Sequence, residues 1–340
     1  MSSDTQAQHS AIKLFFLLLA LCLGVLFWGV SVGSAGFFKF GFVQSDPILA
    51  SIVLDIRLPR TLGALCCGGL LGLSGALAQG LFKNPLADPY LLGSASGATL
   101  GVALALVAFR ISPGSSDWLT RLGLTGAAFI GATAAVLLTL ALARGFQHTL
   151  RLLLCGIVVG VLLGALCSLT LLLEPEVLQS MQIFMLGSTS YIGWNSVGLM
   201  FMGWLICVSI SIALGLFLDG LSLGESTAIS LGFNISPMRA LLIVVLALAV
   251  GLSVAQTGLI GFVGLVSPHL VRSMVKVTHA HLLFLSSWMG AALLGVADIL
   301  ARCLIAPREL PVGVLTAVLG GGYLLWLMQK RQFSRAGGEL

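Results

Sequence analysis

Three arginines and one aspartate are the side chains in this sequence best suited to recognising charge. Arg57 and Arg60 stand three residues apart beside apolar segments, and Arg302 follows Asp298 by four residues. A guanidinium group recognises carboxylates through several fixed donors, so these arginines can bind an acidic partner or anchor the chain at lipid headgroups. The spacing of Asp298 and Arg302 also predicts an ion pair on one helix face.

Three histidines and seven cysteines are the candidates for metal or redox chemistry. His269 follows Ser267-Pro268, and His279 and His281 flank Ala280. Because no Cys, Asp or Glu at ligand spacing lies nearby, helix caps or interfaces are favoured over a haem or zinc site, and no metal site is predicted. The cysteines lie in or beside apolar segments without a Cys-x-x-Cys pair, so they are expected to pack as small apolar side chains.

Chemistry on a bound substrate or nucleotide is not predicted. The sequence has no Gly-x-x-x-x-Gly-Lys-Ser/Thr segment to cradle the phosphates of ATP, and no acid–base pair or nucleophile is recognisable in its apolar regions. We therefore predict no catalytic and no cofactor-binding residue. An ion-coupled secondary transporter stays open as a second class, but it needs ionisable groups deep in the spans, where Asp298 is the only candidate.

The composition predicts an all-α polytopic membrane protein. Of 340 residues, 58% are hydrophobic and only 9% are charged, whereas about a quarter are charged in soluble domains. The net charge of +5 comes from basic residues that flank apolar spans, which does not indicate nucleic-acid binding. Stretches of about 20 apolar residues predict nine spans, at 12–33, 61–82, 91–109, 121–143, 151–173, 197–218, 239–257, 281–303 and 312–329.

A tenth, shorter helix is expected at 259–271, which would place both chain ends on the cytoplasmic side. This topology divides the chain into a cytoplasmic tail (1–11), a transmembrane domain (12–330) and a second cytoplasmic tail (331–340). It places ten Lys and Arg inside and seven outside, a weak bias in the expected direction. Before the second span, Asp46 and Pro47 mark a helix start, so the preceding outer segment should extend that span.

The region 68–98 is expected to organise the bundle. The small residues Gly72 and Gly75 let another backbone approach closely, as helices in lipid require. The prolines that follow force the chain out of the helical region, because each lacks an N–H and restricts the residue before it. This predicts a structural elbow, formed by Asn84, Pro85, Asp88 and Pro89.

An internal duplication is also indicated. The segment Gly72-Leu73-Ser74-Gly75-Ala76 resembles Gly251-Leu252-Ser253-Val254-Ala255. Each copy leads toward proline, at Pro85 and at Pro268, so Pro268 is expected to form a second elbow. With five spans in each half, the copies would run in opposite directions, as in the inverted repeats of transporters.

The region from about residue 12 to residue 330 resembles the permease subunits of bacterial binding-protein-dependent ABC importers for iron complexes and vitamin B12. The motifs that carry this resemblance occur in one order along the chain: Arg57-Leu58-Pro59-Arg60, Ser74-Gly75 with Gln79, Asn84-Pro85-Leu86-Ala87-Asp88-Pro89, Leu92-Gly93, Ser96-Gly97-Ala98, Leu223-Gly224-Glu225 with Leu231-Gly232, Gly261-Phe262-Val263-Gly264-Leu265 with Pro268-His269 and Arg272, Ala297-Asp298 with Arg302, and Glu309-Leu310-Pro311-Val312-Gly313.

The resemblance implies a type II ABC importer permease with about ten transmembrane helices. It would work in the bacterial inner membrane as a homodimer, with two ATPase subunits that hydrolyse ATP and a periplasmic substrate-binding protein. The cytoplasmic segment 219–237, which Gly220, Gly224 and Gly232 are expected to cut into two short helices, would couple to the ATPase. The matching residues are Leu223, Gly224, Glu225, Leu231 and Gly232. Asp219-Gly220 departs from the Leu-Asn pair often found there.

The same resemblance implies that Arg57, Arg60 and Arg302 dock the binding protein. The alternative role for all three is anchoring at lipid headgroups, and Arg302 could instead serve only to pair with Asp298. The substrate would be haem or a ferric siderophore, with cobalamin as the alternative, because specificity in such systems rests largely with the binding protein.

Overall fold

The computed structural model describes residues 2–33, 36–37, 47–109, 118–143 and 149–336. These residues are helical almost throughout. The two strands found among them, β1 (Val32–Gly33) and β2 (Gly36–Phe37), pair antiparallel as a short ribbon after the first helix. The all-α membrane architecture expected from the composition is confirmed.

Ten helices of at least 12 residues follow one another within the described ranges, in the order expected of the spans. They are α1 (Ser2–Ser31), α3 (Leu58–Leu81), α4 (Ser94–Phe109), α5 (Trp118–Leu142), α6 (Thr149–Leu173), α8 (Trp194–Ala213), α11 (Ile235–Thr257), α12 (Val263–Met274), α13 (His279–Cys303) and α14 (Val312–Ala336). Seven helical stretches in the described part of the chain are long and apolar enough to cross a membrane, and α4 and the apolar part of α14 are shorter. The helix α12 is the short tenth helix. The ends expected as tails are partly helical, because α1 begins at Ser2 and α14 continues to Ala336.

Shorter elements connect or extend the long helices. The helix α2 (Pro47–Ser51) and the π-helical turn η2 (Ile52–Arg57) run directly into α3, so the outer segment does extend the second span. Pro47 is the first residue of α2, while Asp46, the expected cap, lies outside the described residues. The other short elements are η3 (Pro89–Leu92), η4 (Pro175–Val177), α7 (Leu178–Leu186), α9 (Gly215–Leu223) and α10 (Glu225–Ser230).

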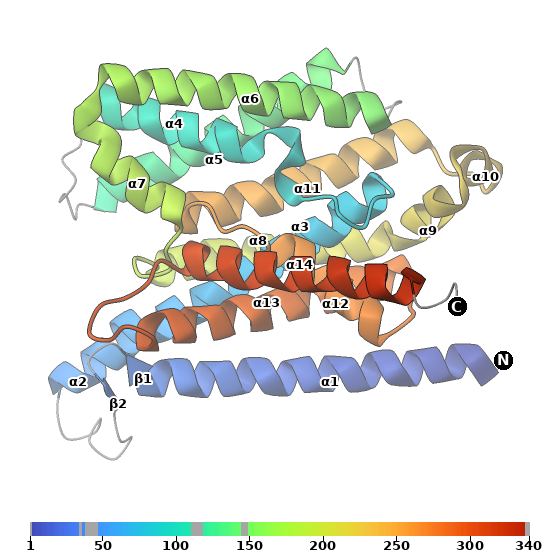
Figure 1. The fold of residues 1–340 in the computed structure, drawn as a ribbon, viewed down its shortest axis with the longest axis horizontal. Coiled ribbons are helices and arrows are strands. Elements are labelled where there is room, and N and C mark those ends of the chain that lie inside the picture. The colour runs from blue at the N-terminus through green and yellow to red at the C-terminus, as the bar shows by residue number, and fades with distance from the viewer. Residues whose placement is uncertain (1, 34–35, 38–46, 110–117, 144–148, 337–340) are drawn as a thin grey trace.

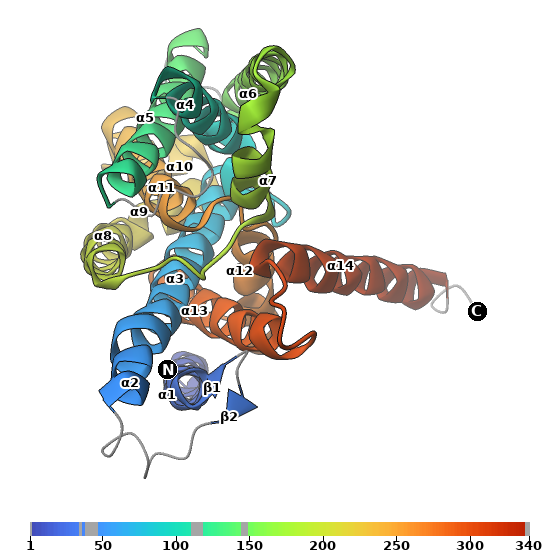
Figure 2. The same cartoon turned by 90° about the vertical axis from the view of Figure 1, so that its left-hand side faces the viewer.

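The helices form an elongated bundle around α3. Figure 1 shows both chain ends together with α9 and α10 at one end of the bundle, which we call the α10 end, and α2 with β1 and β2 at the opposite α2 end. Figure 2 shows α1 on one side, α4, α5 and α6 on the other, and α14 projecting away from the body. An even number of crossings, as predicted, returns both chain ends to the same side.

Small residues on α3 allow the close packing that the sequence predicts. A Cβ atom added at Gly72 would collide with the carbonyl oxygen of Ser286 on α13, and one added at Gly75 would collide with the backbone of Gly264 on α12. Two glycines, Gly68 and Gly290, meet in the same way between α3 and α13. The backbones therefore approach directly, which allows the van der Waals contact that holds helices together in lipid.

The two copies of the repeated segment lie on helices that run in opposite directions. The helix α3 starts at the α2 end, whereas α11 starts beside α10 at the opposite end (Figure 1). The elbow predicted at Pro268 is wrong, because Pro268 lies inside α12. The chain breaks earlier, between Gly258 (φ 71°), which follows the last residue of α11, and Phe262 (φ 68°), which precedes the first residue of α12 in the left-handed conformation.

Candidate functional site

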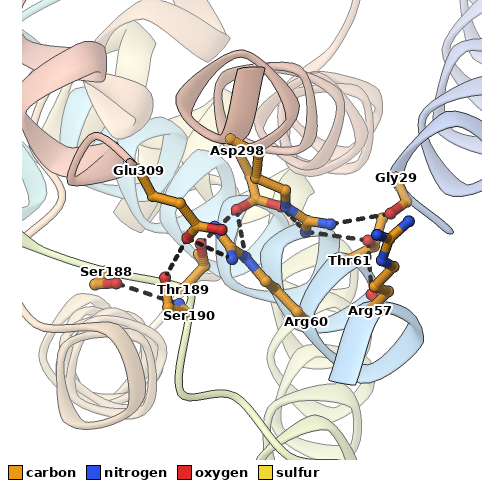
Figure 3. Close-up of polar contacts among 10 residues, drawn as sticks. Gly29, Arg57, Arg60, Thr61, Ser188, Thr189, Ser190, Asp298 and Glu309 are labelled. Atoms are coloured by element: carbon orange, nitrogen blue, oxygen red, sulfur yellow. Dashed lines mark hydrogen bonds and ion pairs between the residues drawn. The ribbon is translucent and has the colours of Figure 1, made fainter. Parts of the chain in front are cut away.

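The arginines singled out in the sequence gather at the α2 end, together with two carboxylates (Figure 3). Arg60 donates through Nε to Asp298 Oδ1 at 3.1 Å and through Nη1 to Glu309 Oε2 at 2.7 Å. Arg302 donates to the second oxygen of Asp298, which confirms the predicted pair one helical turn apart. We call Arg60, Asp298, Arg302 and Glu309 the arginine–carboxylate network.

Hydroxyl groups from other segments complete the network. Thr189 Oγ1 donates to Asp298 Oδ1 at 2.5 Å, and Ser190 Oγ donates to Glu309 Oε2 at 3.1 Å (Figure 3). Arg302 also donates to Thr61 Oγ1 on α3 and to the Gly29 carbonyl near the end of α1. The network thus joins α1, α3, α13, the segment between α7 and α8, and the segment before α14.

Arg57 lies next to the network and holds the end of α1. Its Nη1 donates to the carbonyl oxygens of Val30 and Ser31, at 3.4 and 3.2 Å. These are among the last carbonyls of α1, which have no partner within the helix, so a cation there also complements the helix dipole. Arg57 therefore fixes the α2–α3 segment against α1.

The burial of these charges explains their pairing. Asp298 is fully buried, and Arg302 and Arg60 are 1% and 7% exposed. Buried charges require partners of opposite sign, and two carboxylates balance two guanidinium groups here. Both guanidinium groups are engaged within the chain, so an acidic partner would have to replace one of these bonds. Docking by Arg57, Arg60 and Arg302 stays a prediction.

Two members of this site, Thr189 and Ser190, were not noted in the sequence, and Glu309 was noted only as part of a family motif, without a role. A role for Glu309 could have been predicted, because it is an acid between two spans on the same side as the arginines. Nothing in the pattern marks Thr189 or Ser190, since hydroxyl side chains are common in polar connections. Their position follows from the turn at Gly187 (φ 67°), which directs the chain from α7 toward α13.

The segment predicted to couple to an ATPase forms the α10 end of the bundle. It consists of α9 and α10, separated by Gly224 (φ 130°), and ends at Gly232 (φ 87°). Both glycines occupy backbone conformations that other residues rarely adopt. Gly220 does not break the chain as predicted but lies inside α9, where its missing side chain makes room for Phe233.

Apolar side chains protrude from this segment into solvent. Leu223, Ile229 and Leu231 are 73%, 62% and 60% exposed. The segment lies at the end of the bundle, beyond the long helices, so lipid contact does not explain this exposure. Exposed apolar side chains that gather on two neighbouring short helices outside the long spans favour a protein interface. Of the predicted coupling residues, Leu223 and Leu231 expose such side chains, whereas Glu225, which is 47% exposed, forms an ion pair at 2.6 Å with the buried Arg239 of α11.

The elbow after α3 has the local structure that the sequence predicts. Asn84 Oδ1 accepts the N–H of Leu86, and Asp88 Oδ1 accepts the N–H of Tyr90 at 2.8 Å and so caps η3. Pro89 is the first residue of η3, and Asp88 has an extended backbone (φ −95°, ψ 142°). Burial raises the pKa of the Asp88 carboxyl, against the smaller lowering effect of the Tyr90 N–H.

The three histidines make contacts within the bundle. His269 packs edge-on against Tyr323 of α14, His281 Nδ1 lies 3.0 Å from Thr278 Oγ1, and His279 Nδ1 lies 2.6 Å from Asp219 Oδ1. His269 and His279 thus lie at interfaces between helices, as expected, whereas the contact of His281 is with the start of its own helix. Among the described residues no group of three His, Cys, Asp or Glu is close enough together to hold a metal ion.

Comparison with known proteins assigns this chain to a family. Residues 14–330 match the FecCD transport family, a range that includes the network, the elbow and α9–α10. The chain belongs to this family. Members of the FecCD family are membrane permeases of ABC importers, and ATP is hydrolysed by a separate subunit. The chain is therefore an ABC importer permease and a multi-pass protein of the inner membrane, not an enzyme.

Individual relatives agree on this class. The permease is 38% identical over 334 residues to the hemin transport system permease protein HmuU of Yersinia pestis, which covers 95% of this chain and 96% of that protein. It is 39% identical over 285 residues to the vitamin B12 import system permease protein BtuC of Salmonella schwarzengrund, covering 82% and 83%. A solved metal-chelate type ABC transporter in an inward-facing conformation superimposes with a TM-score of 0.83 at 32% identity, covering 94% and 99%. The type II importer fold is thus confirmed.

Proposed function

We propose that this permease moves haem or a ferric siderophore from the periplasm to the cytoplasm. The observation that carries the proposal is the similarity to the hemin permease HmuU, which extends over nearly the whole of both chains. Cobalamin is the second candidate, because BtuC is equally similar over a shorter region. In either case the chain itself binds no cofactor, and the energy comes from ATP used by a partner subunit.

We assign the α10 end to the cytoplasm and α9–α10 to the ATPase subunit. Supporting this, the exposed apolar side chains Leu223, Ile229 and Leu231 belong to α9–α10, at the end where both chain termini lie. ATP binding favours one orientation of the membrane helices only if it changes contacts at such a surface. The predicted coupling residues Gly224 and Gly232 supply the two turns that present it.

We assign the α2 end to the periplasm and its arginines to the binding protein. The three arginines lie together at the end opposite α10, where a periplasmic partner would arrive (Figures 1 and 3). Charge complementarity raises the rate of such an encounter and selects its orientation. Docking would then begin with an acid of the partner exchanging for Glu309, the more exposed carboxylate of the network, at Arg60.

We propose a homodimer, with two ATPase subunits, in which a second copy packs against α14. Figure 2 shows that α14 projects from the body of the chain. Its apolar side chains Val318, Leu319 and Leu325 are 67%, 52% and 65% exposed. A second copy related by a two-fold axis would cover one side of this helix and enclose a pathway between the two copies.

The ion-coupled alternative is less well supported. Such a transporter needs a carboxylate that can bind a proton or sodium ion within the spans. Asp298 is the candidate, but both its oxygens already accept bonds from Arg60, Arg302 and Thr189. A carboxylate held by two guanidinium groups is suited to a permanent structural role rather than to reversible ion binding.

The test is transport by the complete complex in liposomes. The permease, its ATPase subunit and the binding protein are reconstituted, and uptake of haemin, a ferric hydroxamate and cyanocobalamin is measured with and without ATP. We expect ATP-dependent uptake of haemin or the ferric hydroxamate, none by the permease alone, and a complex mass that corresponds to two copies of each membrane-associated subunit. Uptake of cyanocobalamin alone would favour the second candidate, and ion-driven uptake by the permease alone would refute the class.

A further inference from the structure

The first residue of α13 is held by a carboxylate from α9. Asp219 Oδ1 accepts both the backbone N–H of His279, at 3.0 Å, and a hydrogen bond from His279 Nδ1, at 2.6 Å. Because a carboxylate only accepts, the imidazole carries its proton on Nδ1 in this contact. Asp219 therefore binds the backbone and the side chain of His279 at the same time, which fixes both position and orientation.

Asp219 also supplies a cap that α13 lacks from its own sequence. Thr278 is the N-cap residue, but its side chain makes no capping bond and instead contacts His281. The first N–H groups of a helix have no partner within the helix and favour a negative charge. A carboxylate from α9 thus meets the positive end of the α13 dipole.

Backbone packing reinforces this contact. Gly215, the first residue of α9, lies against Ala280 of α13, and a Cβ atom at Gly215 would stand 2.6 Å from the Cβ of Ala280. The start of α9 and the start of α13 are therefore in direct van der Waals contact, one turn from the Asp219–His279 bonds. The first turn of α13 is thus held to α9 by van der Waals contact as well as by hydrogen bonds.

The opposite end of α13 belongs to the arginine–carboxylate network. The helix has 25 residues, which corresponds to a length of about 37 Å, and it carries Asp298 and Arg302 in its last two turns. Packed against α3 along glycines, it has little freedom to bend. One rigid helix therefore has α9 at one end and the bonds to Arg60 at the other.

We propose that Asp219 and His279 are positioning residues that make α13 follow the coupling helices. Movement of α9–α10 is passed to α13 at this contact and changes the bonds of Asp298 and Arg302 at the α2 end. This inference rests on the proposed role of α9–α10 at the ATPase. By linkage, a partner that binds at the α2 end biases the same movement from the other side.

The proposal is tested on the complete complex with the ATPase and the binding protein, with a spin label attached to the native Cys303. Cys303 is exposed at the end of α13, while the other cysteines are buried except for the half-buried Cys155, which is replaced by serine. A spin label on Cys303 reports movement of the α2 end of α13 between the nucleotide-free and the ATP-vanadate states. Stimulation of ATP hydrolysis by the binding protein is measured on the same samples.

We expect Asp219→Ala and His279→Ala each to abolish the ATP-dependent change at the label and to reduce the stimulation about tenfold. The double variant should be no worse than either single one, because both remove the same contact. Asp219→Asn should restore part of the response, since its amide oxygen still accepts both hydrogen bonds. Ser222→Ala, one turn along α9, is the matched control; its hydroxyl bonds only to the Asp219 carbonyl of its own helix.

An unchanged label response and stimulation in Asp219→Ala would overturn the proposal. Equal losses in Asp219→Ala and Asp219→Asn, accompanied by reduced assembly with the ATPase, would also overturn it, because they indicate a purely structural role. Failure of the proposed function is distinguishable, since the wild-type complex would then show neither ATP hydrolysis nor a label response.

Discussion

Replacing Asp298 by Asn removes one charge from a site that holds two buried guanidinium groups. The Asp298 side chain is fully buried, and those of Arg302 and Arg60 are 2% and 8% exposed. In the variant, Arg302 loses its carboxylate while Arg60 keeps Glu309. One buried positive charge is then uncompensated, and the amide cannot accept all the bonds that the carboxylate accepts.

The expected cost is about 3–5 kcal/mol of unfolding free energy, the range found when one partner of a buried ion pair is removed. Glu309→Gln is the matched comparison, because it removes the same charge from a side chain that is 28% exposed. Water can reach that position and Arg60 keeps Asp298, so about 1 kcal/mol is expected. The difference between the two variants isolates the effect of burial.

The double variant Asp298→Leu with Arg302→Met separates pairing from packing. Both charges of the pair are removed, and Arg60 and Glu309 still balance each other. The combined cost should therefore be lower than the sum of the single costs by about 1–3 kcal/mol. Unfolding is followed by circular dichroism in mixed micelles titrated with SDS. A cost below about 1 kcal/mol for Asp298→Asn, or additive costs in the double variant, would refute this reasoning.

Three further outcomes are expected. Gly75→Val should prevent folding, measured as loss of monodisperse protein, because its side chain would meet the α12 backbone, whereas Gly24→Ala in open space should be neutral or stabilising. Asp88→Asn should raise thermal stability at pH 7 and keep the bond to the Tyr90 N–H, because the amide removes a buried charge but still accepts a hydrogen bond. Since burial raises the pKa of Asp88 above 3.8 in the folded protein, the wild-type carboxyl becomes neutral as the pH falls, and the stability difference between variant and wild type should shrink toward pH 3.8. Leu231→Asp should abolish co-purification of the ATPase without changing thermal stability, because this side chain is 60% exposed.

The spans were predictable because the membrane imposes a local rule. Every backbone polar group in lipid must be satisfied within its own segment, so length and hydropathy suffice to find a crossing helix. The elbow at Asn84 and Asp88 was predictable for a similar reason, since both side chains bond to amides two residues further along. Pro268 failed as a predictor because a proline within a helix removes one bond and clashes only locally, and the packing around α12 keeps the helix continuous.

The partners of the charged residues were decided only by the tertiary structure. Arg60 is separated from Asp298 by 238 residues and from Glu309 by 249, and Asp219 from His279 by 60. Sequence spacing can predict a pair such as Asp298 and Arg302, which the geometry of one helix brings together. It cannot predict which helices are neighbours, because that depends on where glycines let backbones meet, as Gly72 and Gly290 do between α3 and α13. The amino-acid sequence thus determined the helices and their class, and helix packing determined which charges compensate one another.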